Sequence, residues 1–319
     1  MIIITTIITI TTLFFLQINP FVLVQDNFNV DETQAQVMGV MEVAEGAQEN
    51  VALPKSDDRE LTLRLKQDVA QVPEVSAQSV IIIDKEGKKI LYEKNSDTQS
   101  SIASITKLMT ALVVLDQAPD FNREYMITED DRREGGRIFL FDGDRVTIKT
   151  LLNTSLVGSA NTATIALVHA LGLSEQEFVK KMNIKAEELE LKNTYFVDPI
   201  GLSSDNISTA REVASLLEQT LANEIIQKIV SQQKYILKTK QGKQRLVEST
   251  DQLLKQKNGY EVIGGKTGYL GVAGFCFTGQ FKQDEHEIIS VVLDSSGVDL
   301  RFTETDELVS WVFENYLWP

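Results

Sequence analysis

Short apolar runs near both ends of the most regular part of this chain limit the folds open to it. Residues 80–83 and 89–92 flank a polar turn at 85–88, and residues 275–281 and 288–293 follow one another closely. Apolar runs of this length, bounded by polar turn residues, are typical of strands that pair as hairpins. These segments predict an antiparallel sheet.

Helical patterns accompany the strands. Ser174 followed by Glu177 is a capping-box signature for a helix that reaches about Leu191. Residues 210–221 form a second helical stretch, and residues 304–316 have the pattern of a closing helix. A mixed fold of the α/β (α+β) class is therefore expected.

Three short motifs carry the chemistry, namely Ser104-x-x-Lys107, Ser159-x-Asn161 and the run 266–268, which reads Lys-Thr-Gly. Each motif is weak alone, because a chain of this composition contains on the order of one S-x-x-K and one S-x-N by chance. Indeed 231–234 and 204–206 repeat the first two patterns. The order and context of the three segments make the signal specific.

Ser104 and Lys107 are expected near the start of a buried helix, because apolar positions at helical spacing follow them: Leu108, Ala111, Leu112 and Leu115. Residues three apart on a helix are neighbours. A serine hydroxyl is a poor nucleophile at neutral pH, and an adjacent amine takes its proton only when burial or a nearby cation has lowered the amine pKa. Lys107 is the candidate base. The alternative is a helix-capping serine beside a solvated lysine.

The motif set and about residues 74–317 resemble the low-molecular-weight penicillin-binding proteins, the serine D-alanyl-D-alanine carboxypeptidases. The likeness extends to the segments 79–94, 103–111, 143–147, 191–202 and 208–212. The chain departs from the family pattern at Thr162, Ile200 and Ser203, and these changes affect the expected substrate preference more than the chemistry. The resemblance implies an antiparallel sheet flanked by helices, an inserted and mainly helical subdomain, and an active site at their junction.

The resemblance also implies catalytic roles. Ser104 would attack the carbonyl of the penultimate D-Ala, and Lys107 would take its proton. Ser159 would relay a proton to the leaving amine, while Asn161 would hydrogen-bond the substrate peptide and Lys107. The alternative is that Ser159 and Asn161 cap the helix that follows them.

The third motif is expected on a strand that borders a cleft, because Lys266 and Thr267 lie between apolar runs. By resemblance, Lys266 and Thr267 bind the substrate's terminal carboxylate, and Gly268 leaves room for close backbone approach. The alternative is a solvated strand edge followed by a turn.

The oxyanion hole implied by the family consists of the backbone N–H groups of Ser104 and Tyr269. Arg301 aligns loosely with a family arginine near the carboxylate pocket. The alternative for Arg301 is an ordinary surface position.

Composition narrows the function classes. The net charge of −15 and the absence of a basic stripe argue against nucleic acid as a partner. Cys276 is the only cysteine and is expected to be a buried structural thiol. His169 and His286 are isolated and lack ligand spacing, so neither a metal site nor another cofactor is expected.

The N-terminal region differs from the rest. Residues 1–25 contain no charged side chain and are long enough to cross a bilayer, so they predict a membrane anchor or a signal segment. Residues 26–73 are acidic and read as a disordered tether, with a short helix at 61–69. Residues 74–319 are expected to be the peptidase domain, held outside the cytoplasm by the anchor, or secreted if that segment is cleaved.

The function that follows is a serine-type D-Ala-D-Ala carboxypeptidase that acts on peptidoglycan stem peptides through an acyl-enzyme, with β-lactams as inhibitors. The alternatives are a DD-endopeptidase that cleaves cross-links, which the motifs do not separate from the first, and a non-catalytic penicillin-binding scaffold. A class A β-lactamase is disfavoured, because its Glu-x-x-Leu-Asn loop has no match and the nearest segment, 188–192, ends in Lys.

Overall fold

The computed structural model describes residues 63–66 and 70–318. The expected anchor at 1–25 and most of the expected tether at 26–73 lie outside the described residues. Within the described part of the chain, no helix has the length and apolar character needed to cross a bilayer.

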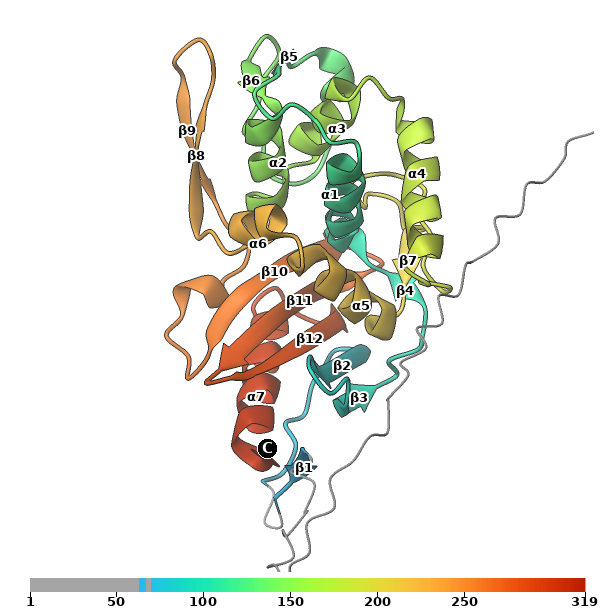
Figure 1. Cartoon of the computed structure of the whole chain (residues 1–319), viewed down its shortest axis with the longest axis vertical. Helices are drawn as coiled ribbons and strands as arrows, with labels where there is room; N and C mark the ends of the chain where they lie inside the picture. Colours follow the sequence, from blue (N-terminus) through green and yellow to red (C-terminus); the bar gives the residue numbers. More distant parts are fainter. Residues whose placement is uncertain (1–62, 67–69, 319) are drawn as a thin grey trace, which may run out of the picture. The chain divides into compact units, whose positions relative to one another are not determined.

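A five-stranded antiparallel sheet is the largest sheet among the described residues (Figure 1). Its strand order is β10-β11-β12-β2-β3, so the two strands that come early in the chain join the three that come late. The bounds are β2 Ser79–Asp84, β3 Ile90–Lys94, β10 Glu261–Leu270, β11 Gly274–Gln283 and β12 His286–Ser295. The expected antiparallel sheet is confirmed.

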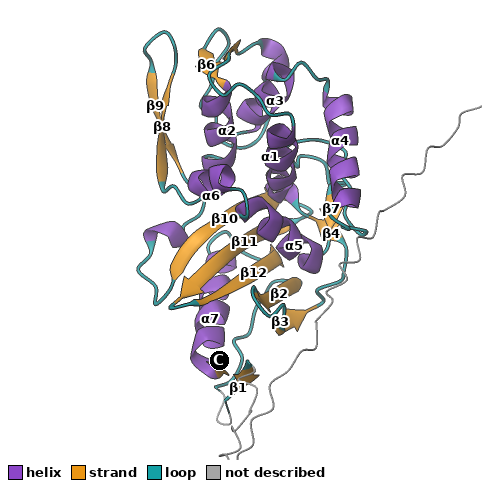
Figure 2. Cartoon of the chain, in the orientation of Figure 1, coloured by secondary structure: helices purple, strands orange, loops and turns teal. Residues whose placement is uncertain are grey.

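Each face of this sheet packs against helices, because successive side chains of a strand point to opposite faces. Val80 and Ile82 belong to a core cluster with α7 (Leu300–Asn315), whereas Ile81 belongs to the cluster that contains α5 (Ala210–Leu221). Figure 2 shows the sheet between these two helices. The sheet is therefore buried on both faces.

A mainly helical region occupies the chain between β3 and β10, as expected. Its helices are α1 Lys107–Asp116, α2 Ile148–Val157, α3 Asn161–Ala170, α4 Glu175–Glu188, α5 and α6 Glu224–Val230, with 3-10 turns at η1 Ala103–Thr106, η2 Glu129–Asp131 and η3 Leu253–Lys255. Three strand pairs accompany them, β4 Ser100–Ser101 with β7 Ile207–Ser208, β5 Glu124–Met126 with β6 Arg145–Thr147, and β8 Lys234–Lys238 with β9 Gln244–Glu248. The capping box of Ser174 and Glu177 is present at the start of α4.

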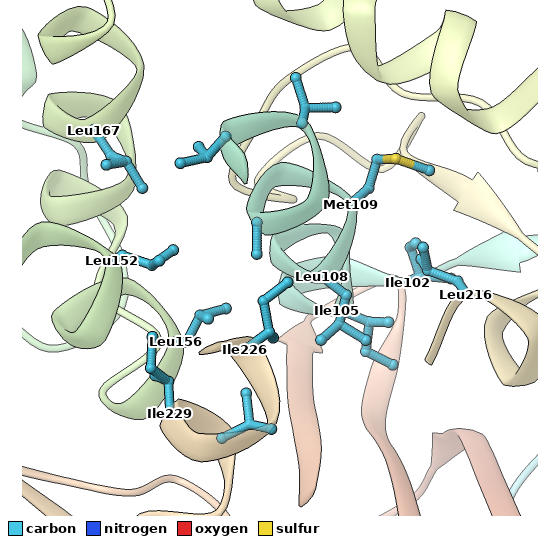
Figure 3. Packing of buried hydrophobic residues seen from close by; sticks show 14 of the residues in the cluster. Ile102, Ile105, Leu108, Met109, Leu152, Leu156, Leu167, Leu216, Ile226 and Ile229 are labelled. Atoms are coloured by element: carbon cyan, nitrogen blue, oxygen red, sulfur yellow. The ribbon is translucent and has the colours of Figure 1, made fainter. Parts of the chain in front are cut away.

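Helix α1 lies in the middle of the larger core cluster. Figure 3 shows Ile105, Leu108 and Met109 of η1 and α1 among side chains from α2, α3, α5 and α6. Leu108 and Met109 are fully buried. This packing fixes η1, which leads directly into α1, against β10 at the junction of the helical region and the sheet.

Two expected element positions are wrong. Arg64–Leu65, inside the helix expected at 61–69, form strand β1 instead. This strand pairs with β13 (Tyr316–Leu317), because the backbone groups of β13 are available to an antiparallel partner. Helix α7 begins at Leu300 rather than near residue 304, since the Phe302 N–H already donates to the Asp299 carbonyl. The earlier start places Arg301 in the first turn of α7.

The core predicts a large cost for truncating Phe277. Its ring is fully buried and lies 5.2 Å from that of Phe302, measured between centroids. Phe277→Ala removes this packing and leaves a cavity, so the free energy of unfolding should fall by about 3–5 kcal/mol in chemical denaturation. The control Ile184→Ala changes an exposed side chain of α4 and should alter it by no more than about 0.5 kcal/mol. Equal effects would contradict the described core.

Candidate active site

Ser104 lies in the 3-10 turn η1, directly before α1, and its backbone is held by a close contact with another loop. Gly201 has a φ of +76°, and a Cβ atom added there would lie 1.9 Å from the Ala103 carbonyl oxygen. Ala103 itself has a φ of +46°, which is unusual for a residue with a Cβ atom. Strain of this kind persists only where the surroundings fix the chain, so the position of Ser104 is tightly determined.

Lys107 follows Ser104 by three residues, and its side chain is fully buried. Its Nζ lies 2.7 Å from Ser104 Oγ, 2.9 Å from Asn161 Oδ1 and 2.6 Å from the Ile200 carbonyl oxygen. Burial lowers the pKa of Lys107 to about 7, against the opposing effect of the Asp198 charge. A neutral Lys107 at this distance can accept the Ser104 proton. The alternative of a solvated lysine is wrong.

Ser159 and Asn161 point into the same site. Lys266 Nζ donates to Ser159 Oγ at 2.7 Å, and Asn161 Nδ2 donates to the carbonyl oxygens of Glu134 and Gly135 at 2.9 and 3.3 Å. The N-cap of α3 is Ala160, which makes no side-chain capping bond. The capping alternative is therefore wrong, because both side chains are bonded to groups of the site instead.

Lys266 and Thr267 belong to β10, the edge strand of the sheet, and both side chains are buried. Lys266 Nζ also donates to the Thr267 carbonyl oxygen at 2.8 Å, while the hydroxyls of Thr267 and Thr250 lie 2.6 Å apart. Burial, together with the charges of Lys107 and Arg301, lowers the pKa of Lys266 well below its usual value. A solvated strand edge is therefore the wrong description.

Gly268 and Arg301 close the site on the α7 side. A Cβ atom on Gly268 would lie 2.7 Å from the Ile102 carbonyl oxygen, so a side chain there would push β10 away from η1. Arg301 is 8% exposed, and its Nη1 donates to the Gly268 carbonyl oxygen at 2.9 Å. Its guanidinium also lies 4.7 Å from the centre of the Phe302 ring. The alternative of an ordinary surface arginine is wrong.

A cleft of about 430 Å³ opens above these groups. Of the residues expected at the site it is lined by Ser104, Ser159, Asn161, Thr267, Gly268, Tyr269 and Arg301, while Lys107 and Lys266 lie buried beside it. The structure thus brings together all nine residues named from the sequence. It also brings to the cleft Gly135, Gly136, Arg137 and Thr250, to which no motif pointed.

Asp198 shapes the loop beside the site, a role that no sequence motif assigned to it. Its Oδ1 accepts the N–H groups of Ile200 and Gly201 at 2.8 and 2.6 Å, and its Oδ2 accepts those of Leu202 and Ser203 at 3.1 and 2.7 Å. The loop folded in this way presents the Ile200 carbonyl oxygen to Lys107. An aspartate just before Pro and Gly is a turn signal that could have indicated this role.

The residues considered for metal or thiol chemistry have other contacts. His169 Nδ1 lies 2.6 Å from Asp131 Oδ1, and His286 stacks on Trp318. Burial raises the pKa of Cys276 to about 11, which suits a structural thiol. Among residues 63–66 and 70–318, no group of three or more His, Cys, Asp or Glu side chains could hold a metal ion.

Comparison with known proteins gives a consistent result. Residues 66–297 match the model of the Peptidase_S11 family, described as D-alanyl-D-alanine carboxypeptidase. The chain is 34% identical to the D-alanyl-D-alanine carboxypeptidase DacF of Bacillus subtilis (strain 168), over 79% of its own length and 66% of that protein. It is 28% identical to a D-alanyl-D-alanine endopeptidase of Escherichia coli (strain K12), over 78% of its own length and 81% of that protein.

A solved structure agrees with these relatives. Penicillin-binding protein D2 from Listeria monocytogenes, in its cefotaxime-bound form, superposes with a TM-score of 0.68 at 27% identity, covering 76% of this chain and all of that one. The family resemblance and the mixed fold expected from the sequence are therefore confirmed.

The Asp198 loop yields a prediction. Asp198→Ala leaves four backbone N–H groups without their acceptor, so the free energy of unfolding should fall by about 2–3 kcal/mol, and acylation of Ser104 should slow because the Ile200 carbonyl loses its place beside Lys107. Denaturation curves and acylation rates measure both effects. Asp205→Ala removes an exposed carboxylate from the same loop and should change neither. A normal acylation rate in Asp198→Ala would refute the positioning role.

Proposed function

Because the chain belongs to the D-alanyl-D-alanine carboxypeptidase family, we propose that it removes the terminal D-Ala from peptidoglycan stem peptides through an acyl-enzyme on Ser104. The observation that carries this proposal is the 2.7 Å contact between Ser104 Oγ and the buried Lys107 Nζ. A base poised near neutral pH beside a hydroxyl is the arrangement that nucleophilic catalysis requires.

In the acylation step, neutral Lys107 accepts the hydroxyl proton while Ser104 Oγ forms a bond to the carbonyl carbon of the penultimate D-Ala. The peptide bond to the terminal D-Ala then breaks, and its nitrogen leaves as an amine that takes the proton held by Lys107, relayed through Ser159. Ser159 lines the same cleft as Ser104, which supports this route. Water then attacks the ester carbonyl while Lys107 accepts its proton and returns it to Ser104 Oγ, which releases the shortened peptide and regenerates Ser104.

The basic side chains and the backbone N–H groups at the cleft suit a peptide that ends in a carboxylate. Thr267 and Arg301 line the cleft and Lys266 lies buried beside it, so these hydroxyl and basic groups suit a terminal carboxylate. The backbone N–H groups of Ser104 and Tyr269 are the proposed donors to the tetrahedral oxyanion. Both residues line the same cleft, which supports this assignment.

A DD-endopeptidase is the second candidate, and one observation favours it. The E. coli relative, which the chain matches over 81% of that protein's length, is named a D-alanyl-D-alanine endopeptidase, and this supports the second candidate. Incubation with a pentapeptide ending in D-Ala-D-Ala and with a cross-linked peptide dimer, followed by mass spectrometry, separates the two. Loss of one alanine from the pentapeptide supports the carboxypeptidase, and cleavage of the dimer alone supports the endopeptidase.

We propose that the enzyme acts outside the cytoplasm, where peptidoglycan lies. Residues 74–319 form the proposed peptidase domain, residues 26–73 its tether, and residues 1–25 a membrane anchor or a signal segment. The lack of charged side chains in residues 1–25 supports an anchor. β-Lactams, which carry a carboxylate beside a strained amide, are the proposed inhibitors of the same cleft.

The direct test uses a fluorescent penicillin. The wild-type protein should gain one covalent adduct by gel and intact mass, and Ser104→Ala should gain none because the acylated oxygen is missing. Ser231→Ala is the matched control, since Ser231 begins another S-x-x-K sequence but is exposed and ends α6. It should label like the wild type. Absence of an adduct on folded wild-type protein would favour the non-catalytic scaffold.

A further inference from the structure

The charges that line the cleft are opposite in sign to the charge of the protein as a whole. The chain carries a net charge of −15. Among the described residues that line the cleft, however, there are the two arginines Arg137 and Arg301 and no aspartate or glutamate. A cleft lined by charges of one sign attracts ligands of the opposite sign. This cleft therefore suits a ligand with more than one anionic group.

Arg137 differs from the two other arginines of its loop in the contacts of its side chain. Arg133 pairs with Glu175, and Arg132 lies 3.8 Å from Asp142. Arg137 is exposed, and within the described part of the chain its side chain forms neither a salt bridge nor a hydrogen bond. Its guanidinium therefore keeps its N–H donors for a group that enters the cleft.

The backbone on both sides of Arg137 is packed against the site. On one side, Gly136 has a φ of +70°, and a Cβ atom added there would lie 3.3 Å from the Ser159 carbonyl oxygen. On the other side, the Phe139 ring lies so close to Gly158 that a Cβ atom added to this glycine would be 2.6 Å from it. The Arg137 backbone is thus held between two contacts with the segment that carries Ser159.

The acidic residues of the same loop do not compete for Arg137. Glu134 is exposed and does not line the cleft, and its backbone carbonyl oxygen accepts Asn161 Nδ2 at 2.9 Å. Asp142 pairs with Arg132. A partner for Arg137 is therefore more readily supplied by a bound ligand than by its own loop.

We propose that Arg137 is a specificity-determining residue that binds a carboxylate of the stem peptide on the N-terminal side of the cleaved bond. The inference rests on the proposed function, in which Lys266, Thr267 and Arg301 bind the terminal carboxylate. A linear stem peptide ends at that carboxylate, so a second anionic group of the same peptide must precede the cleaved bond. Arginine suits this role because its planar guanidinium can hold a carboxylate through two parallel hydrogen bonds.

The test measures D-Ala release by the full-length protein from three pentapeptides that end in D-Ala-D-Ala. The reference peptide has D-isoglutamine and L-lysine at its second and third positions, so it carries no carboxylate before the cleaved bond. The second peptide restores the D-glutamate carboxylate. The third replaces lysine by meso-diaminopimelate, which adds a carboxylate beside the side-chain amine. If only cross-linked dimers are cleaved, the same three sequences serve as the donor strand.

The wild-type protein should prefer an anionic peptide. Its kcat/KM for one of the two anionic peptides should exceed the reference value by roughly tenfold, which lies between the contributions of exposed and buried charged pairs. The preferred peptide identifies which carboxylate Arg137 binds. The preference should reside mainly in KM, because a contact remote from the reacting bond is made equally before and during the reaction.

Substitutions assign the preference to the guanidinium. Arg137→Gln removes the charge, so the ratio of kcat/KM between the anionic and the reference peptide should fall to about one, whereas Arg137→Lys should retain part of it. Arg132→Gln is the matched control, because it removes a charge from the same loop but from a side chain that does not line the cleft. Its ratio should equal that of the wild type. Acylation by benzylpenicillin verifies a working nucleophile in each variant.

The outcomes that oppose the inference are distinct. Equal kcat/KM values for the three peptides in the wild type would overturn it, as would a preference that survives in Arg137→Gln. An equal loss for all three peptides in Arg137→Gln would assign the residue a structural role and also overturn it. Failure of the wild-type protein to be acylated by benzylpenicillin would contradict the proposed function, and the inference with it.

Discussion

The site depends on the burial of one amine. Lys107 is enclosed by the packed helices around α1, so water does not stabilise its charged form, and its pKa falls to about 7. The same enclosure holds Nζ at 2.7 Å from Ser104 Oγ. One packing arrangement therefore supplies both the geometry and the proton affinity that a serine nucleophile requires, and the core of the helical region is part of the chemistry.

The other polar groups of the site are arranged around the Lys107 amine according to their charge. Neutral hydrogen-bond acceptors surround Lys107, whereas the basic side chains of Lys266 and Arg301 lie on the side of the cleft bounded by β10 and α7. Under the proposed function, the free carboxylate of a substrate is drawn to this wall, while its carbonyl lies toward Ser104. Separating the two functions prevents the carboxylate from raising the pKa of the base.

Local sequence patterns predicted the individual strands, helices and motifs of this enzyme better than the long-range contacts between them. The strands, the helix at 210–221 and the three motifs follow from short-range periodicity and residue chemistry, and the structure contains them. The pairing of Arg64–Leu65 with the C-terminal segment was missed because it joins residues about as far apart as the domain allows. Asp198 was missed because its effect on the site arises through the Ile200 carbonyl, which meets Lys107 from a distant part of the sequence.

The central claim is that Lys107 is uncharged often enough at neutral pH to act as a base. An NMR titration of the lysine side-chain carbons, with the Lys107 signal assigned from the spectrum of Lys107→Met, measures this directly. We expect one lysine to titrate near pH 7 and its signal to be missing from the variant. A Lys107 that titrates near pH 10, like a solvated lysine, would contradict the account.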